Sequence, residues 1–342
     1  MPVRDIIVIG ASAGGVEALM MVTARLPPDL PAAVFIVNHV PAESNSRLPA
    51  ILARGAHGPV VHAKDGEPIR YGHVYVAPPD HHLIVKEEHV HLSRGPRENG
   101  MRPASDTLFR SAASSCGSRV IGVVLSGMLN DGTAGLLAIK HCGGLAVVQD
   151  PDDAMYPQMP RSALANVEVD HCVPAAQMGA LLARLAGQQV NGSLPIPKNV
   201  VIEAQIAEGA PINVATAGLA IPAGYSCPDC GGALNEMLDA APLTRFRCRV
   251  GHAHTLASLA GQKVKALQEA LWAALRTQRE RVELYQRMAD QARLQGYVTV
   301  AQKWTRKVEE AQAHAEVIDS VLKAPGGAAT FEDDPELPDS PV

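Results

Sequence analysis

Short aliphatic runs alternate with amphipathic segments along the first 188 residues of the chain. The runs end near Gly, Pro or Asn, and segments 15–26 and 132–140 between them have helical spacing. Aliphatic strands that alternate with helices are typical of a parallel sheet covered on both faces. We therefore predict a doubly wound, mostly parallel α/β fold for residues 1–188, with a hairpin at 82–92 and strands at 5–10, 32–38, 74–77, 120–125 and 145–149.

The remaining residues form four segments of different character. Residues 189–224 are rich in Gly, Pro and Asn, which predicts a linker with a possible short helix. Residues 225–256 form a small cysteine and histidine module, and residues 257–323 carry apolar side chains at three-four spacing. That spacing predicts an α-helical hairpin or coiled coil. We expect the acidic, Pro-containing segment 324–342 to be disordered.

Composition narrows the class of protein. Hydrophobic residues make up 47% of the 342 residues, which is enough for a sizeable core. The net charge of −5 does not indicate binding to nucleic acid or to anionic membranes. No apolar stretch approaches the roughly 18 residues of a spanning helix. Arg4 and Asp5 interrupt the N-terminus before a signal-peptide core could form. We expect a soluble, cytoplasmic protein with no nucleic-acid partner and no membrane insertion.

The glycine-rich segment 10–15 lies between the first predicted strand and the first predicted helix. It can be interpreted as a dinucleotide-binding loop in which Ser12 replaces the middle glycine, or as a nucleophile elbow around Ser12. A dinucleotide site needs an acidic residue at the end of the second strand, where this chain has Asn38-His39 instead. A third interpretation is a plain turn in which Ser12 caps the helix.

His39 and Asp131 follow two further predicted strands. Because parallel strands end at the same edge of a sheet, both side chains could face Ser12 there. A serine nucleophile, a histidine base and an aspartate that orients the histidine form a hydrolytic triad. The alternatives are a histidine with a purely structural role and an aspartate that caps a helix. Spacing alone does not prove that the three residues meet.

Three motifs in this order resemble the catalytic domain of the chemotaxis protein-glutamate methylesterases, the CheB family. They are Gly-Ala-Ser-Ala-Gly-Gly at 10–15, Asn-His-Val-Pro at 38–41 and Ser-Gly-Met-Leu-Asn-Asp-Gly at 126–132, and the similarity covers about residues 1–190. The resemblance implies hydrolysis of glutamate methyl esters on chemoreceptors in chemosensory adaptation, with no cofactor for catalysis. It implies Ser12, His39 and Asp131 as catalytic residues, and backbone N–H groups of Ala13 and Met128 as the oxyanion hole.

The chain also departs from the usual family pattern. Ala13, Asn38 and Leu129 stand where the family commonly has Thr, Gln and Gly, and each adjoins or lies near a triad residue, so we expect an altered substrate fit. Because the first strand is predicted at Asp5, we expect a stand-alone form that lacks a receiver domain. Arg102 and Arg161 are candidate contacts for acidic groups on the receptor, although surface or structural roles are the alternatives.

The cysteine module has the spacing of a zinc site. Cys227 and Cys230 are separated by two residues, and Cys248 and His252 by three, which is typical of a zinc-ribbon-like module. Four protein ligands predict a structural rather than a catalytic zinc ion. His254 is an alternative fourth ligand, and a redox switch is a further interpretation. The ribbon and the helix after it look familiar from C-terminal extensions of stand-alone family members.

The sequence therefore supports several functional hypotheses. The first is a protein-glutamate methylesterase that acts on a methylated chemoreceptor or another methyl-accepting protein. The alternatives are deamidation of receptor glutamines, a signalling adaptor that uses the esterase fold as a scaffold, and nucleotide binding at segment 10–15. A response regulator, a methyltransferase or a sensor could bind the C-terminal helices.

Overall fold

The computed structural model describes residues 2–190, 194–238 and 242–324. Its contacts divide the chain into two compact units, of which the first ends at Ser258 and the second begins at Leu259. No helix among the described residues is long and apolar enough to cross a membrane.

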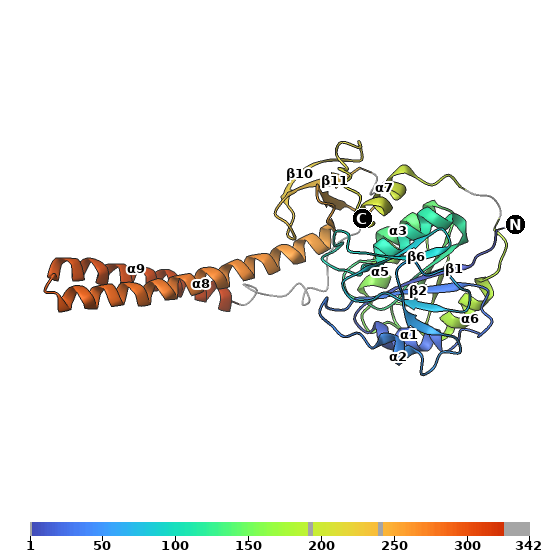
Figure 1. Cartoon of the computed structure of the whole chain (residues 1–342), viewed down its shortest axis with the longest axis horizontal. Coiled ribbons are helices and arrows are strands. Elements are labelled where there is room, and N and C mark those ends of the chain that lie inside the picture. The colour runs from blue at the N-terminus through green and yellow to red at the C-terminus, as the bar shows by residue number, and fades with distance from the viewer. Residues whose placement is uncertain (1, 191–193, 239–241, 325–342) are drawn as a thin grey trace. The chain divides into compact units, whose positions relative to one another are not determined.

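A seven-stranded parallel sheet forms the centre of the first unit (Figure 1). Its order is β3-β4-β2-β1-β7-β8-β9, so β1 lies between β2 and β7. The predicted mostly parallel sheet is confirmed, and the structure adds the short edge strands β3 and β9. The strands are β1 Ile6–Ala11, β2 Ala33–Asn38, β3 Val60–His62, β4 Val74–Val76, β7 Val120–Val124, β8 Leu145–Gln149 and β9 His171–Val173.

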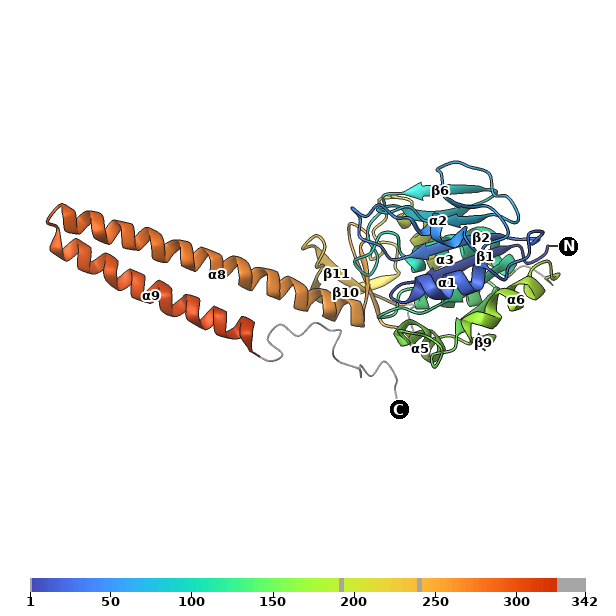
Figure 2. The same ribbon diagram turned by 90° about the horizontal axis from the view of Figure 1, so that it is seen from below.

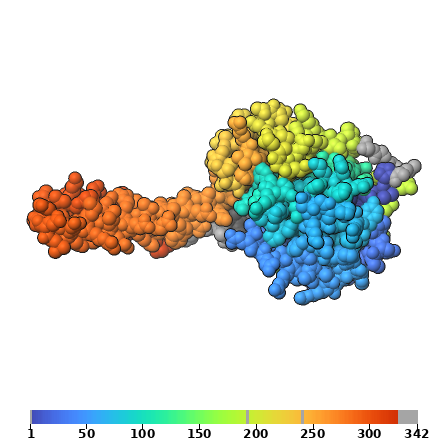
Figure 3. Space-filling model, in the orientation of Figure 1, coloured from blue at the N-terminus to red at the C-terminus, as the bar shows by residue number. Residues whose placement is uncertain are grey.

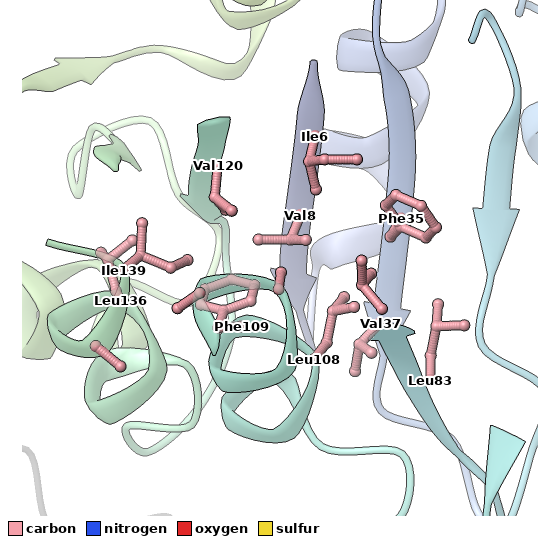
Figure 4. Close-up of a cluster of buried hydrophobic side chains, with 14 of the residues drawn as sticks. Ile6, Val8, Phe35, Val37, Leu83, Leu108, Phe109, Val120, Leu136 and Ile139 are labelled. Atoms are coloured by element: carbon pink, nitrogen blue, oxygen red, sulfur yellow. The ribbon is translucent and has the colours of Figure 1, made fainter. Parts of the chain in front are cut away.

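Helices cover both faces of this sheet because its strands are apolar on both sides. On one face, Ile7 and Ile9 of β1 pack in a cluster with helices α1 Gly15–Thr23, α2 Leu48–Leu52 and α6 Ala175–Leu185. On the other face, Ile6 and Val8 pack with α3 Ser105–Cys116, α4 Thr133–His141 and α5 Gln158–Asn166 (Figure 4). The predicted hairpin, β5 His82–Lys86 and β6 His89–Ser93, contributes to this second cluster. A short 3₁₀ turn, Gly117–Arg119, leads into β7.

The first unit also contains α7 Lys198–Ala207 and a four-stranded antiparallel sheet in the order β10-β11-β12-β13. Figure 3 shows this part of the chain, in yellow, against the green surface of the α/β domain. Segment 189–224, for which we predicted a linker with a possible short helix at 201–208, includes α7 and the start of β10. The physical reason is that Val200, Ile206 and Ala207 are buried. The strands are β10 Ala220–Ser226, β11 Ala233–Met237, β12 Arg245–Cys248 and β13 Ala253–Thr255.

The second unit consists of α8 Leu256–Leu294 from Leu259 onward and of α9 Val298–Lys323, two long helices (Figure 2) joined by a tight turn at Gly296. Leu275, Ala315 and Leu322 form its buried cluster, and the rings of Tyr285 and Trp304 lie 5.4 Å apart. The predicted helical hairpin is therefore present. Apart from Ala324, the segment 324–342 predicted to be disordered lies outside the described residues.

Candidate active site

The loops after β1, β2 and β7 meet at one edge of the sheet. Ala11 of β1 is paired with Asn38 of β2, so Ser12 and His39 follow directly from paired positions. On the other side of β1, the N–H of Leu125 donates to the carbonyl of Gly10 (2.9 Å), which brings the loop after β7 alongside Ser12. Strand β2 lies on one side of β1 and β7 lies on the other, so the strand order reverses at β1. In open α/β sheets, ligands bind in the crevice that such a reversal of strand order leaves.

His39 joins Ser12 to Asp131. Its Nδ1 lies 3.1 Å from Ser12 Oγ, and its Nε2 lies 2.7 Å from Asp131 Oδ2. Because an ionised carboxylate can only accept, Nε2 carries the proton and Nδ1 accepts the hydrogen bond from the serine hydroxyl. The three predicted catalytic residues are thus brought together in one hydrogen-bonded chain.

Asp131 is buried but remains ionised. Burial alone would raise the pKa of its carboxyl, but the hydrogen bond and charge of His39 and the N–H of Ser105 hold that pKa below its ordinary range. The Ser105 N–H donates to Oδ2 (2.6 Å), and the Asp106 N–H donates to Oδ1 (3.3 Å). Asp131 can therefore stabilise a positive charge on His39.

Asp106 is a second buried carboxyl beside the first, and the sequence analysis did not identify it. Burial and the neighbouring charge of Asp131 raise the pKa of Asp106 to about 8. Its Oδ1 accepts the Gly135 N–H at 2.6 Å. Two adjacent buried carboxylates repel each other, so only Asp131 of this pair is charged at neutral pH.

The serine loop has the geometry of a tight turn rather than of a serine-capped helix. The N-cap of α1 is Gly14, with φ of 67° and no side-chain cap, so the interpretation of Ser12 as a capping residue does not hold. Asp131 likewise is not the N-cap of α4, which is Gly132. A Cβ on Gly14 would lie 2.8 Å from Ser126 Oγ, and one on Gly127 would lie 2.9 Å from Ser12 Cβ. Glycine at these positions allows the two loops to approach each other closely.

Ala13 and Met128 directly follow Ser12 and Gly127, the residues at which the two loops approach each other. Among the hydrogen bonds of the described residues, neither the Ala13 N–H nor the Met128 N–H has an acceptor within the protein, whereas the N–H groups of Gly127 and Leu129 donate to Tyr156 O and Gln158 Oε1. That pattern leaves Ala13 and Met128 available for a ligand oxygen.

The two predicted substrate-binding arginines have different environments. Nε and Nη2 of Arg102 donate to Asp80 Oδ1 at 2.9 and 2.7 Å, and Nη1 donates to the carbonyls of Arg94 and Gly95. The guanidinium of Arg102 is thus used within the protein. Arg161 is exposed on α5. Contact of either arginine with substrate stays a prediction.

The predicted metal ligands Cys227, Cys230, Cys248 and His252 come together at the ends of β10 and β12. Their ligand atoms all lie within 4.8 Å of one another. The Cys230–Cys248 sulfur distance is 3.7 Å, and His252 Nδ1 lies 3.8 and 3.6 Å from the sulfurs of Cys227 and Cys248. These distances fit the edges of a tetrahedron around Zn²⁺, since Zn–S bonds of about 2.3 Å give edges of about 3.8 Å.

The alternative ligand His254 lies near Cys227 and Asp229. Its Nε2 is 3.8 Å from the Cys227 sulfur and 3.1 Å from Asp229 Oδ2, and these three residues form a second candidate ligand group. Because His252 completes the four-residue group with three thiols, the geometry favours His252 over His254 as the fourth ligand.

Several known proteins are similar to the first half of the chain. The sequence matches the CheB methylesterase family over residues 7–182. A Leptospira interrogans relative named for protein-glutamate methylesterase and protein-glutamine glutaminase activity is 40% identical over 182 residues, which are 53% of this chain and 94% of the relative. The Burkholderia lata protein-glutamate methylesterase/protein-glutamine glutaminase 3 is 41% identical over 188 residues, 54% of this chain and 52% of that protein.

A solved structure agrees with these sequence matches. The Thermotoga maritima CheB methylesterase catalytic domain is similar with a TM-score of 0.52 and 33% identity, over 53% of this chain and 98% of that one. The matched residues include all three members of the Ser12–His39–Asp131 chain. The chain belongs to the CheB methylesterase family.

Proposed function

We propose that this protein is a protein-glutamate methylesterase that hydrolyses glutamate methyl esters on chemoreceptors. The observation that carries the proposal is the position of His39 between Ser12 Oγ and Asp131 Oδ2, at 3.1 and 2.7 Å. The names of the relatives in Leptospira and Burkholderia support the choice of ester and of protein substrate.

The reaction uses this geometry twice. Ser12 Oγ attacks the ester carbonyl while His39 Nδ1 takes the hydroxyl proton, and Asp131 stabilises the imidazolium that forms. The tetrahedral intermediate collapses, and His39 returns the proton to the methoxy oxygen, so that methanol leaves. Water then attacks the acyl-enzyme and loses a proton to His39. As the bond to Ser12 Oγ breaks, His39 returns that proton to Oγ, which regenerates the serine, and the released glutamic acid ionises to the carboxylate.

Backbone donors stabilise the charge that develops on the carbonyl oxygen. The N–H groups of Ala13 and Met128 are proposed for this role because they flank Ser12 and lack acceptors among the described residues. One such donor is commonly worth about 3 kcal/mol of barrier. Neither the attack nor the hydrolysis calls for a metal ion.

Deamidation of receptor glutamines is a second candidate activity of the same site. Attack of Ser12 on a glutamine amide gives the same acyl-enzyme, with ammonia as the leaving group in place of methanol. The glutaminase activity in the names of both relatives favours this possibility.

The decisive experiment measures methanol release from a panel of methyl-esterified chemoreceptor signalling domains. We expect the unaltered protein to release methanol and Ser12→Ala to lower kcat by at least about 10³-fold. Ser320→Ala, the same change at an exposed serine of α9, serves as the control. Undiminished release by Ser12→Ala would refute the assignment of Ser12 as the nucleophile.

We also propose that Cys227, Cys230, Cys248 and His252 hold a structural zinc ion. Such an ion would join the β10–β11 turn to the end of β12 and so stabilise the sheet. Mass spectrometry of the native protein should find about one zinc ion per chain, and Cys248→Ser should lose it. Cys172→Ser, which changes an exposed cysteine on β9, should retain it. Equal zinc content in the two variants would contradict the ligand set.

A further inference from the structure

The C-terminal part of the first unit contacts the α/β domain at residues 97–99, next to Asp131 of the candidate active site. We call residues 220–258 the extension. Its last strand, β13, pairs with residues 97–99: the Ala253 N–H donates to Arg97 O (3.2 Å), and the Asn99 N–H donates to Ala253 O (2.8 Å). The extension thus forms a parallel β-bridge with the loop that precedes α3.

Asn99 connects this junction to Asp131. Its side-chain oxygen accepts hydrogen bonds from the Thr255 N–H (3.1 Å) and from Ser258 Oγ (2.8 Å). Its side-chain nitrogen donates to Asp131 Oδ1 (3.2 Å) and Asp106 Oδ2 (3.3 Å). Since two donors face one end of the amide and two carboxyls face the other, only one orientation of the amide satisfies all four groups.

We propose that Asn99, held by Thr255 and Ser258 of the extension, is a positioning residue for Asp131. The proposal rests on the methylesterase function proposed above. Asn99 and the Asp106 N–H hold Asp131 Oδ1, which leaves Oδ2 directed at His39 Nε2. The same amide nitrogen of Asn99 also donates to Asp106 Oδ2, so it links the two carboxyls. Without it, Oδ1 keeps only the hydrogen bond from the Asp106 N–H (3.3 Å) while the Ser105 N–H still holds Oδ2, so the Asp131 carboxylate is less firmly oriented toward His39.

A second contact reinforces the same loop. Thr255 Oγ1 donates to Asn130 Oδ1 at 2.7 Å, and Asn130 immediately precedes Asp131. All the side chains in this network are buried: Thr255 and Ser258 are each 1% exposed, and Asn130 is 2% exposed. Because the network is closed to water, a change in the extension alters the hydrogen bonds of Asn99 and Asn130, which lie beside the aspartate.

The test compares full-length variants of both sides of the junction. Asn99→Ala removes a hydrogen bond to a charged group and should lower kcat for methanol release by about 10- to 100-fold. Ser258→Ala removes one partner of Asn99 and should lower kcat by about 2- to 10-fold. KM should stay within about twofold for both, since neither side chain reaches the substrate. Ser320→Ala should leave both constants unchanged.

Thr255 supplies a matched pair of variants. Thr255→Val removes the hydroxyl but keeps the shape, and it should lower kcat by about 2- to 10-fold. Thr255→Ser keeps the hydroxyl and should restore kcat. If Asn99→Ala does not fold, as judged by circular dichroism, the variants at Thr255 and Ser258 carry the test.

An independent measurement does not need the receptor. The proton on His39 Nε2, shared with Asp131, should give a downfield ¹H NMR resonance that shifts or broadens in Asn99→Ala and Ser258→Ala but not in Ser320→Ala. Unchanged kcat together with an unchanged resonance would overturn the positioning role. If the unaltered protein releases no methanol, the proposed function fails, and the resonance alone then decides whether Asn99 positions Asp131.

Discussion

Replacement of Arg247 by methionine should destabilise the first unit by about 3 kcal/mol. Arg247 lies on β12 of the extension and is 1% exposed. Its Nη2 donates to Glu98 Oε1 (2.9 Å) and Glu203 Oε2 (2.6 Å), and its Nη1 donates to Gly251 O (2.7 Å). Burial alone would raise the pKa of Glu203, but three neighbouring arginines hold that pKa well below its ordinary value, so Glu203 is charged.

The magnitude follows from the contacts that the substitution removes. Two hydrogen bonds between charged groups are worth about 3 to 6 kcal/mol together. Glu98 keeps its ion pair with Arg110, and Glu203 keeps its ion pair with Arg245, so neither carboxylate is left without a partner. Methionine also fills most of the space of the arginine stem. The cost should therefore lie at the low end, about 3 kcal/mol, which is also the low end for breaking a buried ion pair.

The assay must report on the first unit alone. Both tryptophans of the chain, Trp272 and Trp304, lie on α8 and α9, so tryptophan fluorescence reports on the hairpin. Urea unfolding of the first unit should instead be followed by hydrogen exchange of peptides from α3 and β12. With a denaturant dependence of about 3 kcal/mol per M, Arg247→Met should lower the midpoint for these peptides by about 1 M.

Arg279→Met is the control for this prediction. Arg279 is a hairpin arginine whose side chain is 61% exposed and pairs with Asp319 at 3.3 Å. An exposed pair of this kind contributes less than about 1 kcal/mol. If Arg247→Met moved the α3 and β12 midpoint by no more than about 0.3 M, the buried ion pairs would be worth no more than exposed ones, and the reasoning would be refuted.

Two further predictions concern the active site. Because the pKa of Asp106 is raised to about 8, its folded state holds a proton that the unfolded state has lost, so the thermal stability of the first unit should fall as pH rises from about 4 to about 8. Asp106→Asn should flatten that dependence of Tm on pH, and an unchanged slope would show that Asp106 does not cause it. Gly127→Ala places a Cβ 2.9 Å from Ser12 Cβ and in still closer contact with the sulfur of buried Met159, so the loop must shift and kcat for methanol release should fall by at least tenfold. Circular dichroism checks that the fold is kept. Full activity of Gly127→Ala would mean that the two loops can separate without loss of the catalytic geometry.

Much of the α/β domain could be predicted because buried parallel strands leave a strong local pattern. Strands of five or six residues at β1, β2, β7 and β8 are apolar except for the last residue of β2 and of β8, and each was expected. The three-residue edge strands β3 and β9 were missed because their partly exposed residues show no such run. The motifs identified Ser12, His39 and Asp131 as residue types. Their contact depends on the register of β1 against β2 and on the order of strands in the sheet, which no local pattern contains.

The buried polar residues that support the active site, such as Asn99 and Ser258, could not be predicted, because their partners also lie far away in the sequence. Asn99 and Ser258 are 159 residues apart, and no local pattern indicates that either polar side chain is buried. Glu203 lies in a segment whose Gly and Pro content indicated a linker, yet it is 1% exposed. A buried glutamate in such a segment is explained only by its partners Arg245 and Arg247, more than 40 residues later in the chain. Polar residues that are buried through distant partners leave no hydrophobic signal to find.

The buried ion pairs and the hydrogen bond to Asp131 depend on two consecutive residues, Glu98 and Asn99. Glu98 holds the buried ion pairs with Arg110 and Arg247, and Asn99 holds Asp131, while β13 pairs with the backbone of this same segment. If β13 moves, Asn99 should therefore move with it. The exception would be that the ion pairs of Glu98 are enough to hold residues 97–99 in place. The stability effect of Arg247→Met and the kcat effect of Ser258→Ala separate these two contributions. If Arg247→Met lowers stability but keeps kcat, while Ser258→Ala lowers kcat but keeps stability, then the ion pairs hold the extension and the amide of Asn99 alone transmits its position to the active site.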